Sequence, residues 1–299
     1  NGTEVRNDRV TPPVLYDTLG PKGRRNVRIG TALGLVVVLG IVGWVLWRLA
    51  ASDQLEAERW GILFDTEAGV PQSLGRALLN TLRAAAVGMV FSMILGAILA
   101  AGRLSDHAWV RRPVDIVVQF FRGIPLLLLI FFVFLGLPQL GVNLDLFWSL
   151  VLGLTLYNMA VLAEIFRAGI LSIDRGQSEA GYALGLLKTQ VMALILVPQA
   201  VRRMLPAIVS QLVTLLKDTS LGFVIGYFEL LRQGRSIVEF LGPRYVLQIY
   251  VGVAAMYIAV NLSLSLLARY LDKRTSRNPK IVFDPKAEEA QPVIPLGRE

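Results

Sequence analysis

Six long apolar stretches, separated by shorter polar segments, dominate the pattern of residues along the chain. A helix needs about 20 mostly apolar residues to cross a bilayer, because lipid offers no hydrogen-bond partner to an exposed backbone. The stretches cover residues 29–49, 74–101, 114–137, 147–170, 207–230 and 245–267. The pattern therefore predicts an all-α fold, a polytopic transmembrane helical bundle of about six spans. The first stretch is too long for a cleavable signal, and Trp44 and Trp47 at its far end are typical of a membrane interface.

The positions of lysine and arginine predict the orientation of these spans. Basic residues cluster before the first stretch, after the second, after the fourth and after the sixth, whereas the other connections hold fewer. Since cytoplasmic loops carry the excess of basic residues, both termini are expected in the cytoplasm. Residues 50–73 are then extracellular, where residues 60–64 form either a short interfacial helix or a plain loop.

Composition narrows the class of protein further. The chain has 299 residues, 54% hydrophobic and 17% charged, and its mean hydropathy is +0.57. The net charge of +8 could indicate a nucleic-acid partner, but the basic residues flank the apolar stretches, so we expect the lipid bilayer instead. With no cysteine and a single histidine, His107, we expect neither a metal site nor catalytic residues.

The longest connection, residues 171–206, separates the fourth and fifth spans and exceeds an ordinary helix connection. Its apolar positions predict two short helices separated near Gly185, which form an elbow on the cytoplasmic side. Gly185 is expected to let the two helices approach closely. The alternative is a plain amphipathic surface hairpin.

The spacing within this connection resembles the "EAA" coupling motif of the permease subunits of binding-protein-dependent ABC importers. Gly181 stands where the family usually has alanine, and Val197 where it has leucine. Three further elements resemble the polar amino-acid branch of the family: residues 121–125, 163–170 and 217–221. The positions that match the coupling motif are Glu179, Ala180, Gly181, Gly185, Ile195 and Pro198.

The resemblance covers about residues 74–271 and implies the five-helix core of a type I ABC importer, with the coupling loop at 171–206. It leaves a basic cytoplasmic tail at 1–28, an extra transmembrane helix at 29–49 and a disordered cytoplasmic tail at 272–299. An extra first helix is similar to that of actinobacterial glutamate permeases. The implied function is import of a polar amino acid, with glutamate or glutamine favoured, across the bacterial cytoplasmic membrane.

The resemblance also implies partners. An ABC ATPase dimer would dock on the coupling loop, an extracellular or periplasmic amino-acid-binding protein would deliver substrate, and a second permease, homologous or identical, would complete the pore. The sequence contains no G-x-x-x-x-G-K-[ST] motif, so ATP and Mg are expected on the partner ATPase and no cofactor on this chain.

Polar residues within the spans are candidates for a substrate pathway, because a charge at mid-membrane costs about 2.5–3.5 kcal/mol. Thr155 and Asn158 lie one turn apart; they either face a central cavity or hold the bundle through an interhelical hydrogen bond. Four successive polar residues interrupt the fifth span and are expected to line a pathway or a subunit interface, with the two charges partly neutralising each other: Lys217, Asp218, Thr219 and Ser220. Glu164 and Arg167, three apart, are expected to form a structural pair.

Two other classes remain as alternatives. A secondary amino-acid transporter or channel would suit six spans with intramembrane charges, but it would lack a loop for docking a motor. A membrane enzyme would need a cluster of catalytic carboxylates or histidines, which the sequence does not show.

Overall fold

The structure, a computed structural model, describes residues 20–275 and contains helices and turns but no β-strand in that range. It falls into two compact units, Asn1–Gly61 and Ile62–Glu299. The helices are α1 (Pro21–Ala51), α2 (Ala57–Trp60), α3 (Val70–Arg103), α4 (Ala108–Gly123), α5 (Leu126–Phe131), α6 (Leu137–Gln139), α7 (Leu146–Leu171), α8 (Arg175–Ala183), α9 (Lys188–Gln190), α10 (Val197–Asp218), α11 (Gly222–Ile225), α12 (Leu230–Leu241) and α13 (Val246–Thr275).

The first unit contains α1, which is long and apolar enough to span a membrane. This helix begins at Pro21, a residue suited to the first helical turn, so residues 21–28 are helical rather than part of the predicted tail. At the other end of the chain, α13 continues to Thr275, past the predicted tail start at 272. The remainder of both predicted tails lies outside the described residues.

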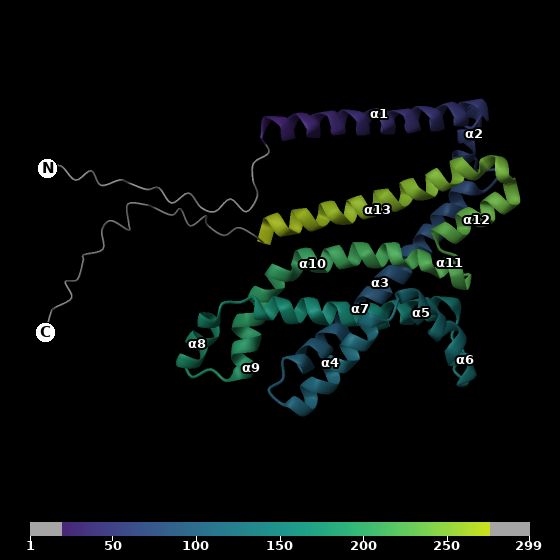
Figure 1. Ribbon diagram of the computed structural model, residues 1–299. Helices are drawn as coiled ribbons and strands as arrows, with labels where there is room; N and C mark the ends of the chain where they lie inside the picture. The colour runs from purple at the N-terminus through teal and green to yellow at the C-terminus, as the bar shows by residue number, and fades with distance from the viewer. Residues whose placement is uncertain (1–19, 276–299) are drawn as a thin grey trace, which may run out of the picture. The chain divides into compact units, whose positions relative to one another are not determined.

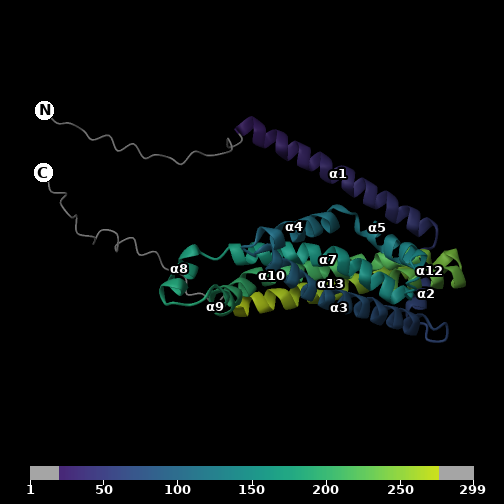
Figure 2. The same ribbon diagram turned by 90° about the horizontal axis from the view of Figure 1, so that it is seen from below.

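The second unit is a bundle of α3, α7, α10 and α13, with α4 and α5 on α7. Figures 1 and 2 both place α8 and α9 at one end of this bundle and α12 at the opposite end. Glycines of α3 allow close approach to α7: a Cβ on Gly96 would lie 2.9 Å from Cβ of Leu162. Small residues at helix contacts are typical of membrane proteins, where close packing replaces the hydrophobic effect.

The third predicted span, residues 114–137, is not one continuous helix. The axes of α4 and the α5–α6 segment differ by 99° at Ile124 and Pro125. Proline disfavours helical backbone in the preceding residue, and Ile124 is extended with ψ 130°. The described residues therefore contain five helices long and apolar enough to span a membrane, or six spans if this bent pair counts as one.

The fifth predicted span also differs from expectation. A π-helix at Val191–Leu196 joins α9 to α10, so the helical path runs from Lys188 onward instead of from residue 207. It leaves the α-helical form at Asp218, where a 3-10 turn, Thr219–Leu221, leads into α11. The predicted interruption at the four polar residues is thus a change of helix type.

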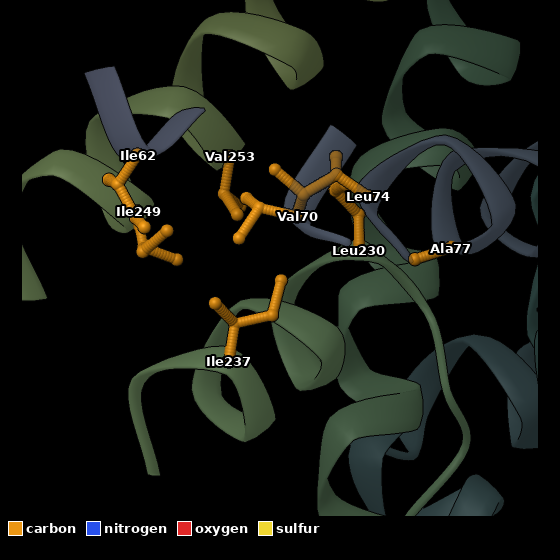
Figure 3. Close-up of a cluster of buried hydrophobic side chains, with 8 residues drawn as sticks. All are labelled: Ile62, Val70, Leu74, Ala77, Leu230, Ile237, Ile249 and Val253. Atoms are coloured by element: carbon orange, nitrogen blue, oxygen red, sulfur yellow. The ribbon is translucent and has the colours of Figure 1, made fainter. Parts of the chain in front are cut away.

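A cluster of buried side chains closes the end of the bundle that carries α12 (Figure 3). Ile62, from the 3-10 turn Gly61–Phe64, contacts this cluster, so part of the connection before α3 folds onto the bundle as short helical turns. The cluster comprises Ile62, Val70, Leu74, Ala77, Leu230, Ile237, Ile249 and Val253. It fixes α3, α12 and α13 at the end opposite the elbow.

Candidate functional site

The elbow between α7 and α10 turns near Gly185, as the sequence predicts, but only its first arm, α8, is a separate short helix. The second arm, α9, continues through the π-helix into α10, which corrects the prediction of two short helices. The backbone of Gly185 has φ +80°, a left-handed conformation that glycine adopts without strain. The Gly185 N–H donates to the carbonyl of Tyr182 at 2.9 Å, and the Leu186 N–H donates to that of Gly181 at 3.2 Å. This pair of bonds is a Schellman motif, which ends α8 and turns the chain back.

Close approach of the two helices depends on Gly181 and not on Gly185, which corrects the sequence prediction. A Cβ on Gly181 would lie 2.8 Å from Cγ2 of Val191 and 2.9 Å from Cδ1 of Ile195. A Cβ on Gly185 would meet nothing within 4 Å. Gly181 is buried and Ile195 half-buried, so these two positions of the motif hold the elbow together.

The other motif positions, Glu179, Ala180, Gly185 and Pro198, are exposed. The tip beside Gly185 also presents large apolar side chains to solvent: Leu184 is 81% exposed and Leu187 68%. Exposed apolar groups clustered on a polar element are typical of an interaction surface.

The elbow is fixed to the rest of the bundle by polar contacts from the arm that α9 and α10 form. Lys188 forms an ion pair with Asp106 in the α3–α4 connection, and this contact lowers the pKa of the Asp106 carboxyl. Arg203 donates to the carbonyl of Ser172. These contacts hold the elbow in one orientation relative to α3 and α7.

A cluster of five charged side chains lies at the same end of the bundle, where α3, α4 and α7 meet. Arg103 donates to Asp115 and Glu164, both at 2.5 Å, and only 8% of its side chain is exposed. Glu164 also accepts from Arg167 at 2.6 Å and lies 3.3 Å from Arg122. Charged side chains enclosed between helices in this way are tolerated because each has a partner of opposite sign.

The sequence predicts only the Glu164–Arg167 pair in this cluster, because those two residues are three apart on one helix. Arg103, Asp115 and Arg122 reach Glu164 from other helices, which spacing cannot reveal. The available signal was a charged residue directly after the stretch 74–101, Arg103, together with charged residues inside the next two stretches, Asp115, Arg122 and Glu164.

Asn158 is fully buried in α7, and its amide takes part in an interhelical hydrogen bond. The Gln211 side chain of α10 donates to Oδ1 of Asn158 at 2.6 Å, and Asn158 donates to the Leu154 carbonyl at 2.8 Å. This is the structural alternative that the sequence left open. Thr155 is also buried, but it lines a small apolar pocket beside Phe91.

Lys217 and Ser220 line a different pocket, a groove of about 710 Å³ between α10 and α13. The structure therefore does not bring them into one cavity with Thr155 and Asn158. Lys217 is exposed and makes no ion pair with any residue whose side chain is described, Asp218 included. Thr219 is fully buried and donates to the Leu216 carbonyl at 2.6 Å.

A buried carboxylate that the sequence analysis missed lies at the other end of the bundle. Glu229 is fully buried and caps α12 by accepting from the N–H groups of Leu231 and Arg232, at 2.8 and 2.6 Å. Tyr257 of α13 donates to the same carboxylate at 2.7 Å. The signal was an acidic residue directly before a helix, a common capping position.

Residues 20–275 contain no group of three or more histidine, cysteine, aspartate or glutamate side chains able to hold a metal ion.

The structure is a helical bundle with several helices long and apolar enough to span a membrane and an exposed elbow at one end, and comparison with known proteins gives its family. Residues 92–277 match the family described as "Binding-protein-dependent transport system inner membrane component", and the chain belongs to that family. It is a permease subunit of an ABC importer and not an enzyme.

Three similar proteins illustrate the match. The probable glutamine ABC transporter permease protein GlnP of Bacillus subtilis is 41% identical over 197 residues, which cover 66% of this chain and 90% of GlnP. The glutamate transport system permease protein GluD of Corynebacterium glutamicum is 35% identical, covering 76% of this chain and 83% of GluD. The crystal structure of an amino acid ABC transporter with histidines has a TM-score of 0.65 at 29% identity, covering 70% of this chain and 97% of that one.

Proposed function

We propose that this permease subunit carries a polar amino acid, glutamine or glutamate, inward across the bacterial cytoplasmic membrane. The names of the two relatives support this substrate class. The proposal includes an amino-acid-binding protein outside the membrane and a second permease, homologous or identical, that completes the pore.

The elbow is the observation that carries the mechanism. Its exposed apolar tip, Leu184 and Leu187, stands on two helices locked together at Gly181, so a force applied at the tip reaches α10 without bending the elbow. We propose that an ATPase dimer docks here, with Glu179 at the contact, and that ATP and Mg bind to that ATPase.

This arrangement requires the elbow and both termini to face the cytoplasm, as the distribution of basic residues predicts. The chain has no cysteine, so single cysteines can test the orientation directly. Leu184→Cys at the elbow tip and Phe240→Cys on α12, which is 83% exposed, lie at opposite ends of the bundle. In intact cells, a membrane-impermeant maleimide should label Phe240→Cys and spare Leu184→Cys; the reverse pattern would overturn the orientation.

For the pathway, we propose that Lys217 and Ser220 face substrate from the groove between α10 and α13. An exposed ammonium without an ion pair at a spanning helix is suited to a substrate carboxylate. Asp218 is next to Lys217 in the chain, whereas the hydrogen bonds of Asn158 and Thr219 support a role in holding the bundle, and Thr155 is buried beside the small pocket at Phe91.

The central test is ATP-dependent uptake of glutamine and glutamate by proteoliposomes that contain the full complex and the binding protein. Glu179→Lys should reduce ATPase association and uptake together, because it reverses a charge on the docking face. Glu67→Lys, the same change at an exposed site before α3, is the matched control and should leave ATPase association unchanged. Uptake by this chain alone, driven by an ion gradient, would contradict the proposal.

A further inference from the structure

A large apolar groove lies between α3 and α10 at the end of the bundle that carries the elbow. Its volume is about 750 Å³, within the range of about 300–1,000 Å³ typical of small-ligand sites. Ala97 and Met93 of α3 form one wall, Val201 and Leu205 of α10 the other, and Phe166 of α7 also lines it. It lies apart from the groove that Lys217 and Ser220 line.

The position of this groove determines what can fill it. All five of these residues belong to helices long and apolar enough to span a membrane, so the groove runs along spanning helices toward the end that carries the elbow. Water is a poor occupant of such an apolar site, because it would find few polar partners. An occupant must therefore present an apolar surface to these walls.

The groove ends in a polar mouth at the level of the elbow. Asp106, His107 and Lys188 line this mouth. Arg111 lies close by, since its side chain donates to the Ser105 carbonyl at 3.3 Å and its charge acts on Asp106. Two permanent cations, Lys188 and Arg111, thus act on one carboxylate, which leaves an excess positive charge beside the mouth of the groove.

We infer that this groove binds an anionic glycerophospholipid, with one acyl chain between α3 and α10 and the phosphate at Lys188 and Arg111. An apolar channel that opens beside excess positive charge matches the two ends of such a molecule. The orientation proposed above would place this lipid in the cytoplasmic leaflet. The binding itself does not depend on that orientation.

The bound lipid would contact both sides of a functional junction. One wall is α3, and the other is the helix that continues directly from the elbow, including Met192 of the π-helix. Filling the groove would brace the elbow against α3, alongside the Lys188–Asp106 ion pair. Membrane composition would then regulate coupling.

The test uses the full transporter complex in phosphatidylcholine nanodiscs that contain phosphatidylglycerol with a photoreactive group in one acyl chain. We expect labelled peptides from the Ala97 region of α3 and from α10, and competition by unlabelled phosphatidylglycerol. Ala97→Trp should fill the groove and abolish this labelling. Ile98→Trp is the matched control, because Ile98 is 62% exposed on the same helix and does not line the groove.

The headgroup is tested by repeating the labelling with photoreactive phosphatidylcholine. Lys188→Gln should reduce the preference for phosphatidylglycerol about fivefold, the effect of about one basic residue near a charged membrane. Arg175→Gln, an exposed position on α8 outside the groove, should leave that preference unchanged. Each variant is first checked for complex assembly by size-exclusion chromatography.

Three results would overturn the inference: equal labelling in Ala97→Trp, equal labelling by the two lipids, or cross-links from the groove to a protein chain in place of lipid. Because labelling needs neither ATP nor substrate, a failure here is distinguishable from a failure of the proposed transport function.

Discussion

The two charged regions of the bundle, the Arg103–Glu164 cluster and Lys217, differ in how the protein surrounds a charge. In the cluster, three guanidinium groups and two carboxylates from α3, α4 and α7 lie within hydrogen-bond or ion-pair distance of one another. Lys217 lacks an ion pair with any described side chain and faces a groove. A charge enclosed by partners contributes to the fold, whereas a charge left open is available to something that binds.

The largest effect on stability is expected from a substitution in the Arg103–Glu164 cluster. Glu164→Gln removes the carboxylate shared by Arg103, Arg122 and Arg167, and it leaves the enclosed guanidinium of Arg103 with Asp115 as its one remaining partner in the cluster. We expect a loss of about 3 kcal/mol in the free energy of unfolding, the lower end for breaking an enclosed pair, since 27% of the Glu164 side chain is exposed.

Thermal unfolding in detergent measures this loss. Glu239→Gln is the control, because it breaks the exposed Arg235–Glu239 pair and should change stability by less than about 1 kcal/mol. Equal shifts of the melting temperature in the two variants would show that enclosure of the cluster adds nothing to the stability of the protein.

The next largest effect is expected from disturbing the packing of Gly181 inside the elbow. Gly181→Leu forces a side chain into Val191 and Ile195, and overpacking of this kind costs about 2 kcal/mol. Because the overpacking is centred on the elbow, ATPase association should fall more strongly than the melting temperature of the spanning bundle. Gly75→Ala, where a Cβ meets nothing within 4 Å, is the control, and normal association in Gly181→Leu would contradict the rigid-elbow mechanism.

The amino-acid sequence predicts some of these features and not others. Apolar runs fix the number of spans because lipid leaves the backbone no alternative, and the turn at Gly185 follows from local residue preferences. The 99° bend had a local signal in Pro125, but a long apolar run conceals such a break. Contacts such as Gln211 with Asn158 join residues 53 positions apart, and only the packing of α7 against α10 brings them together.

The hydrogen bond between Gln211 and Asn158 predicts a smaller effect on stability. Asn158→Leu leaves the Gln211 amide without its acceptor, and interhelical hydrogen bonds in membranes are worth about 1 kcal/mol. The double variant Asn158→Leu with Gln211→Leu should recover most of the lost stability, because it removes both polar groups. If the single variant lost uptake at unchanged stability, and the double variant recovered none, Asn158 would belong to the substrate pathway after all.

The smallest effect on stability, and the sharpest test of the comparison, is expected at Lys217. Because Lys217 makes no ion pair with Asp218, Lys217→Met should change the free energy of unfolding by less than about 0.5 kcal/mol. Uptake should nevertheless fall about tenfold at low substrate concentration, the loss expected for one charge-assisted hydrogen bond to a carboxylate. Adding Asp218→Leu distinguishes the two roles: if Lys217 only neutralised Asp218, the single variant would be unstable and the double variant would recover both stability and uptake. Stable single and double variants that both fail to transport would instead assign the Lys217 ammonium to the substrate.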